Sequence, residues 1–177
     1  IFLFVTIIAI VVSARKSAKI SEFSAMLHQT LIDEQTGEID EAKSGLKAIY
    51  ENKSSPSGVK ALASLRYAAL LFDEGKNLEA VKIYEEVNKC HSCNSYVRDV
   101  AGLLEIKILM SDEQESKKED LLKRIKMIES SAKSLKYHVS EQRALLEMKN
   151  NNLAESYRIF DLILRSPNKS AAALKER

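Results

Sequence analysis

The sequence predicts an all-α protein in which about four helical hairpins stack behind an N-terminal transmembrane helix. Three observations favour this fold class: a helix-forming composition, a hairpin pattern that recurs at a fixed stride, and an apolar first stretch. The 177 residues include only five glycines, two prolines and no tryptophan, and chains rich in Ala, Leu, Lys and Glu form helices readily. We therefore expect an anchor and basic junction over residues 1–20 and a repeat domain over residues 21–177.

The clearest hairpin is the segment Leu65–Val87, LRYAALLFDEGKNLEAVKIYEEV. Apolar and small residues recur at helical spacing on both of its arms. Gly75 stands where the first helix must end, because glycine adopts a left-handed cap without steric cost. Asn77 can cap the next helix, and Ala68 and Ala80 permit the two backbones to approach closely. This pattern is typical of a tetratricopeptide-type helical hairpin.

The hairpin pattern occurs three times. Each copy has a glycine or asparagine, a small residue five positions later and a large apolar residue four positions after that. The copies are Gly37, Ala42 and Leu46; Gly75, Ala80 and Tyr84; and Asn151, Ser156 and Phe160. The first two turns are 38 residues apart and the third follows after 76, so a degraded copy is expected near residue 113. Periods of this size indicate stacked helical hairpins.

The first 14 residues, IFLFVTIIAIVVSA, contain only two polar side chains. As a helix they span about 21 Å, whereas a bilayer needs roughly 20 apolar residues. Because the chain starts with isoleucine, we interpret them as the second half of a transmembrane anchor with further residues upstream. A signal-peptide core cleaved after Val12-Ser13-Ala14 and a buried core helix remain alternatives. The basic junction RKSAK leaves the membrane orientation open.

The remaining helices follow from apolar periodicity and from the loops between them. Residues 21–35 and 40–52 form the first hairpin, and the Ser- and Pro-containing stretch 54–58 separates it from the second. Ser116 and Glu119 have capping-box spacing, and Pro167 ends the last helix. The later helices are expected over residues 95–110, 117–134, 137–149 and 153–165, with a short capping helix or frayed tail over 170–177.

Cys90 and Cys93, in the sequence CHSC, are the one arrangement that resembles a reactive site. In an exported domain they could close a local disulfide. A thiol redox pair is an alternative, although the strand–helix context of such motifs is missing. Zinc is a weaker one, because the motif offers three crowded ligands and lacks a second pair.

Nothing else in the sequence supports catalysis, so we expect no enzyme, no cofactor and no metal. His28 and His138 fall in predicted helices without a nucleophile or a ligand set at recognisable spacing. A phosphate-binding glycine loop is missing, so no small-molecule substrate is expected. The 27 basic and 25 acidic residues nearly balance, whereas nucleic-acid partners usually need a strong basic field.

Recognition of protein partners through the helix surfaces is the remaining expectation. In stacked hairpins, the first helix of each pair lines the concave side. The predicted partner groove consists of Leu62, Leu65, Phe72, Val100, Leu103 and Met110. If neighbouring helices do not cover them, these apolar side chains could hold a peptide or a partner helix. The alternative is that they pack against adjacent repeats.

The apolar start, the RKSAK junction and the segments GEIDEA, LRYAALLFDEGKNLEAVKIYEEV and NNLAESYRIF together resemble the bacterial membrane-anchored tetratricopeptide-like family. That family includes the ancillary subunit of the Sec translocon, and the resemblance covers nearly the whole chain. It implies a single-pass inner-membrane protein, held by residues 1–14, with a periplasmic repeat domain. Its implied partners are translocon subunits and periplasmic chaperones during protein export. The CHSC motif is no part of that family's pattern.

Two other functions stay open at this point. The first is a cytoplasmic-facing or envelope-assembly adaptor of the same fold. The second is a thiol redox protein that uses Cys90 and Cys93.

Overall fold

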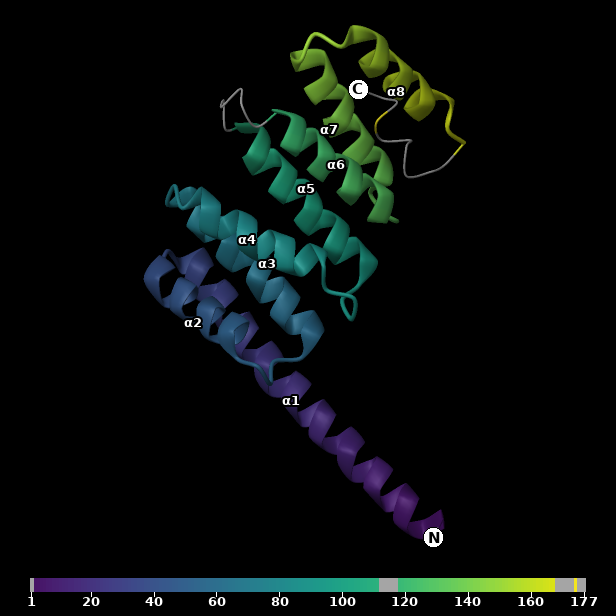
Figure 1. Cartoon of the computed structure of the whole chain (residues 1–177). Coiled ribbons are helices and arrows are strands. Elements are labelled where there is room, and N and C mark those ends of the chain that lie inside the picture. Colours follow the sequence, from purple (N-terminus) through teal and green to yellow (C-terminus); the bar gives the residue numbers. More distant parts are fainter. Residues whose placement is uncertain (1, 112–117, 168–173, 175–177) are drawn as a thin grey trace. The chain divides into compact units, whose positions relative to one another are not determined.

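A computed structural model describes residues 2–111, 118–167 and 174 of the chain (Figure 1). Within these residues all regular structure is helical, which confirms the predicted all-α class. The helices are α1 (Phe2–Thr36), α2 (Ile39–Glu51), α3 (Ser57–Asp73), α4 (Asn77–Asn88), α5 (Ser95–Ser111), α6 (Lys118–Ser131), α7 (Lys136–Lys149) and α8 (Leu153–Arg165). α2 and α5 to α8 agree with the expected ranges to within three residues, whereas α3 begins at Ser57, inside the stretch 54–58 that was expected to be a loop.

The first compact unit comprises residues 1–76 and contains α1, α2 and α3. α2 packs against both α1 and α3, and α1 also touches α3. The helices meet through a shared apolar core, because each presents buried residues on one face. These residues include Phe23, Leu27, Ala42, Leu46, Ile49, Tyr67 and Leu71.

α1 corrects the expectation of a transmembrane anchor. It runs without a break from Phe2 to Thr36, so the anchor and the first repeat helix are one continuous helix. Among the described residues, no helix is long and apolar enough to cross a membrane. Within the described part of α1, the apolar residues before Arg15, Lys16 and Lys19 are fewer than the roughly 20 that a bilayer requires. The predicted transmembrane helix and the bacterial inner-membrane localisation with a periplasmic repeat domain are therefore wrong on this evidence.

The second compact unit comprises residues 77–177 and contains α4 to α8. Each helix packs against the next in sequence, and α5 also touches α7. Two apolar clusters form its core. The larger joins Ile106, Ile125, Ile128, Ala132, Val139 and Leu146, and the smaller joins Ala144, Ile159 and Ile163. The predicted hairpin Leu65–Val87 is thus divided between the units, with α3 in the first and α4 in the second.

Three helices end in the same type of left-handed turn. Gly37, Gly75 and Asn151 have φ values of 87°, 76° and 61°. In each case the N–H of the following residue returns to a carbonyl five positions back, as in Lys76 to Leu71 at 2.8 Å. This bond pattern satisfies carbonyls that the helix end would otherwise leave free. The prediction of left-handed caps at these three positions is confirmed, whereas the copy expected near residue 113 lies outside the described residues.

Two buried acids organise the second unit. The Asp99 side chain is 2% exposed, and its Oδ2 accepts hydrogen bonds of 2.6–2.9 Å from the backbone N–H groups of residues 133, 134 and 135. Glu105 receives two hydrogen bonds from the Arg124 guanidinium, at 2.5 and 2.8 Å. Through these hydrogen bonds the two buried acids hold α5 to α6 and to the turn before α7.

Candidate functional site

The groove predicted from sequence has its first half on α3. Leu62 and Phe72 are 46% and 40% exposed, and Leu65 is partly buried. These side chains belong to the first compact unit. These side chains line neither of the two cavities described below.

The second half of that predicted groove lies on α5, in the second unit. Val100, Leu103 and Met110 are all partly buried. Leu103 and Met110 pack against the larger apolar cluster of this unit, which is the alternative that the sequence left open for them. Because the two halves belong to different units, the groove that would join them stays a prediction.

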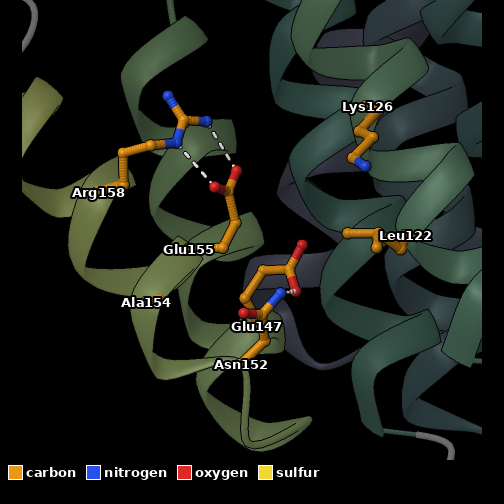
Figure 2. Close-up of a pocket in the computed structure, with 7 residues that line it drawn as sticks. All are labelled: Leu122, Lys126, Glu147, Asn152, Ala154, Glu155 and Arg158. Atoms are coloured by element: carbon orange, nitrogen blue, oxygen red, sulfur yellow. Dashed lines mark hydrogen bonds and ion pairs between the residues drawn. The ribbon is translucent and has the colours of Figure 1, made fainter.

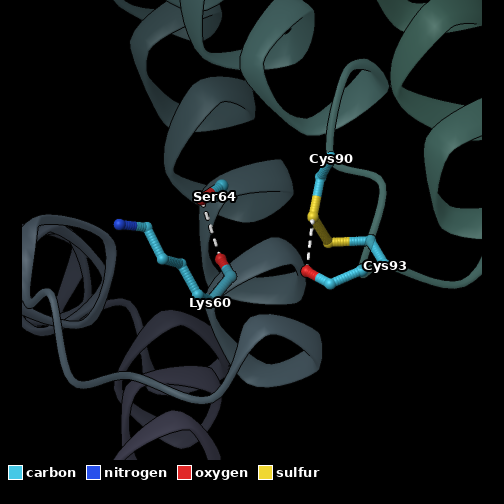
Figure 3. The surroundings of a disulfide bond; sticks show 5 residues. Lys60, Ser64, Cys90 and Cys93 are labelled. Carbon is cyan, nitrogen blue, oxygen red and sulfur yellow. Dashed lines mark hydrogen bonds between the residues drawn. A yellow bond between two sulfur atoms is a disulfide. The ribbon is translucent and has the colours of Figure 1, made fainter.

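The CHSC motif forms the turn between α4 and α5, and its two sulfurs are bonded. Cys90 and Cys93 are joined by a disulfide of 2.03 Å, with their Cα atoms 5.4 Å apart. Figure 3 shows this pair, together with the Ser64 hydroxyl donating to the Lys60 carbonyl inside α3. Among the described residues, no group of three or more His, Cys, Asp or Glu side chains could hold a metal ion.

A hollow of the second unit lies along α6, α7 and α8. One cavity, of about 580 Å³, is lined by side chains of all three helices. Leu122 and Lys126 of α6 lie on one side, and Glu155 and Arg158 of α8 lie on the other, with Glu147 of α7 near its base (Figure 2). The complete lining is Leu122, Lys126, Glu147, Asn152, Ala154, Glu155 and Arg158.

A second cavity, of about 520 Å³, continues along the same three helices toward the end of α8. Apolar side chains from α7 and α8 supply part of its wall, and basic side chains supply much of the rest. Its lining includes Tyr137, Ile159, Leu162 and Ile163, together with Lys136, Arg143, Arg158, Arg165 and the single acid Glu129. We call the two cavities together the α6–α8 groove.

An ion-pair network joins side chains that line the two cavities. Arg143 of α7 lies 3.2 Å from the Glu129 carboxylate and 4.0 Å from that of Glu155. Glu155 in turn accepts two hydrogen bonds of 2.7 Å from Arg158, one helical turn further along α8. Ser140 also donates to Glu129, at 2.5 Å. The network restrains these lining side chains, because each of its charges has an opposite partner.

The network shifts the ionisation of its members. The hydrogen bond from Arg158 is the main reason that the pKa of Glu155 lies below its usual value, with further lowering by the nearby charges of Arg158, Arg143 and Lys126. The same hydrogen bond raises the pKa of Arg158. Each group therefore stays charged across the physiological pH range.

Sequence reasoning missed this groove. Glu129 belongs to a mixed-charge run that predicts a solvated helix face, and Arg143 stands alone in the printed sequence. The one usable signal was Glu155 with Arg158, an oppositely charged pair spaced to meet on a helix. The site arises because α6 and α8 lie on either side of α7, and no local pattern encodes that arrangement.

Among the described residues, the groove combines paired and unpaired charged side chains. Within its lining, the Ser140 hydroxyl donates to the Glu129 carboxylate at 2.5 Å. His28 is exposed on α1 and His138 is partly buried on α7, and neither lines either cavity. Comparison of the chain with protein-family models, with curated proteins and with solved structures found no match.

Proposed function

We propose that this chain is a non-enzymatic, protein-binding scaffold of tetratricopeptide-like helical repeats. The recurring left-handed turn at Gly37, Gly75 and Asn151 supports the repeat character. The helix pairs α1–α2 and α7–α8 pack directly on either side of such a turn. A scaffold of this kind recognises partners through grooves between its helices.

The α6–α8 groove is the observation that carries the proposal. It combines apolar side chains with charged ones over two adjoining cavities of about 580 and 520 Å³. An extended or helical peptide buries its apolar side chains in such a groove while its polar groups meet the rim. A hollow formed by three packed helices also needs little rearrangement to accept a partner.

The partner class comes from the resemblance in sequence layout. Translocon subunits and export chaperones are the partners that we propose to test first. An envelope-assembly or cytoplasmic adaptor would use the same groove for a different protein. The two versions differ in the identity of the bound partner and share the binding surface.

Site-specific photocrosslinking tests the proposal. A photoreactive amino acid replaces Leu162, a half-exposed residue that lines the groove, in the full-length chain expressed in bacteria. We expect it to capture one defined protein, and immunoblots for translocon subunits and export chaperones identify it. The same amino acid at Leu78, an exposed apolar position on α4 outside the groove, is the control.

The crosslink supports the proposal only if the identified partner also binds the purified chain. Equal capture from Leu78, or no capture from Leu162 when the partner is overproduced, would remove it. Capture of a translocon subunit would favour the export role, and capture of a different protein would favour the other adaptor.

A thiol redox function is the second candidate, because Cys90 and Cys93 are bonded in the structure. It predicts that the reduced chain reduces the disulfides of insulin and that Cys90→Ser abolishes this activity. A reduced chain that leaves insulin turbidity unchanged would eliminate this candidate without affecting the scaffold proposal.

A further inference from the structure

We infer that the end of the α6–α8 groove beside the last turns of α8 binds an acidic segment that carries leucine side chains. This inference rests on the proposed function and specifies the chemistry of its partner.

The cavity at this end of the groove is lined by more basic than acidic side chains. Four basic side chains and one acidic side chain line its cavity, although the whole chain is nearly balanced, with 27 basic and 25 acidic residues. Arg143 and Arg158 are held by carboxylates of the network. Lys136 has no ion-pair partner within 4.0 Å among the described residues, and Arg165 is paired only with Asp161 of its own helix. Lys136 and Arg165 can therefore turn toward an acidic ligand at little cost.

The apolar wall offers a place for a branched aliphatic side chain. Ile159 and Ile163 are buried at its floor, whereas Leu162 beside them is 53% exposed. An exposed leucine next to a buried apolar floor gains most from a ligand that covers it. The partner must therefore carry apolar side chains as well as acidic ones.

Leu174 is an example of a side chain that packs against this apolar wall. It belongs to the segment after α8, and it is partly buried against the cluster of Ala144, Ile159 and Ile163. It is not among the described residues that line the cavity. A leucine from beyond α8 thus already packs against Ile159 and Ile163, and we expect a partner leucine to contact the same apolar wall.

A binding titration with a designed probe tests the inference. The probe is a fluorescein-labelled peptide, blocked at both ends, in which pairs of leucine alternate with pairs of glutamate. Its fluorescence anisotropy is followed as the full-length chain is added. We expect saturable binding that weakens with added salt, and much weaker binding of a peptide with lysine in place of glutamate.

Two variants locate the site. The double variant Lys136→Gln, Arg165→Gln should weaken binding about three- to tenfold, because two exposed charge contacts are lost. Leu162→Ala should weaken it by a similar factor of about three to ten. The control variant Lys107→Gln, Lys133→Gln removes the same charge from exposed positions outside the groove and should leave the affinity unchanged. Circular dichroism checks that all variants are folded.

The inference is overturned if the acidic peptide does not bind, if the lysine peptide binds equally well, or if the control variant weakens binding as much as the groove variants. None of these results contradicts the scaffold proposal if the photocrosslink from Leu162 to an identified partner has been observed. Loss of that crosslink as well would remove both.

Discussion

At the scale of single residues, one carboxylate oxygen holds the turn that leads into α7. Asp99 projects from α5 and its Oδ2 accepts three backbone N–H groups, from residues 133, 134 and 135. Backbone donors at the start of a helix lack partners within the helix. Here a side chain more than thirty positions away in sequence supplies the acceptor, and its negative charge also suits the helix dipole.

We predict that Asp99→Ala lowers the free energy of unfolding by about 3 kcal/mol, because three partly buried backbone donors lose a charged, buried acceptor. Urea denaturation followed by circular dichroism measures the change. Asp120→Ala is the matched control, since Asp120 is an exposed residue of α6 with a single neighbouring lysine, and its effect should stay within about 0.5 kcal/mol. Equal effects of the two variants would contradict this role of Asp99.

Glu155 gives a pH-dependent prediction. The hydrogen bond from Arg158 lowers its pKa below the usual value of 4.5, so folding favours its charged form. This stabilisation is complete above the pKa of the unfolded chain and is lost as the pH falls through the lower pKa of the folded state. We expect the difference in unfolding free energy between wild type and Glu155→Gln, at most about 1 kcal/mol for a near-surface pair, to shrink below about pH 4.5.

Urea denaturation at a series of pH values measures that difference. Glu119→Gln is the control, because the Glu119 side chain is exposed and forms no ion pair among the described residues. A difference between wild type and Glu155→Gln that stayed constant, or that grew toward low pH, would show that the ion pair does not stabilise the folded state.

At the scale of the helices, α1 and α2 approach closely because one contact position lacks a side chain. A Cβ atom added at Gly45 would lie 2.2 Å from Cγ2 of Thr30. Thr30 cannot easily move away, since its hydroxyl donates to the carbonyl of Leu27 at 2.8 Å and its branched side chain is stiff. The pair therefore sets the distance between the two helices.

We predict that Gly45→Ala destabilises the first unit by about 1–3 kcal/mol, because overpacking outweighs the gain of about 1 kcal/mol from a better helix former. Thermal denaturation measures the change. Adding Thr30→Ser removes the obstructing methyl group and should restore most of the stability. Gly58→Ala in α3, where an added Cβ meets nothing within 4 Å, should be neutral or stabilising. Destabilisation by Gly58→Ala, or no rescue by Thr30→Ser, would contradict the packing argument.

The helices also show where sequence reasoning stopped. The bounds of α2 to α8 follow from apolar periodicity and turn residues, and most agree with the structure within one or two positions. The predicted anchor does not agree with the structure, because an apolar first stretch does not indicate whether the helix continues past Arg15 and Lys16. The α6–α8 groove could not be predicted from the sequence either, because Glu129, Arg143 and Glu155 become neighbours only when three helices have packed.

At the scale of the whole molecule, the recurring feature is the left-handed helix end. Gly37, Gly75 and Asn151 adopt it with the same hydrogen-bond pattern. An added Cβ at Gly37 or Gly75 would meet nothing within 4 Å. The requirement for glycine there comes from the backbone conformation alone, which costs other residues roughly 1–2 kcal/mol.

We predict that Gly37→Ala and Gly75→Ala each destabilise the chain by about 1–2 kcal/mol and that their effects add, because each strain is confined to its own turn. Asn151→Gly should be neutral or stabilising, whereas Asn151→Ala should be destabilising. Thermal denaturation compares these variants. Glu38→Ala, at a neighbouring residue with φ of −80°, should change little. An equal cost for Glu38→Ala would show that the left-handed turns are not the cause.

The sequence by itself determined most of the helix bounds from α2 onward and the spacing of the left-handed turns at Gly37, Gly75 and Asn151. These features depend on local forces: side-chain periodicity and the φ preferences of glycine and asparagine. The tertiary structure alone decided that α1 is one continuous helix, that Leu103 and Met110 pack inward and that α6 and α8 enclose a charged groove over α7. Burial and charge pairing depend on which helix faces meet, and that is settled by the packing of the whole unit.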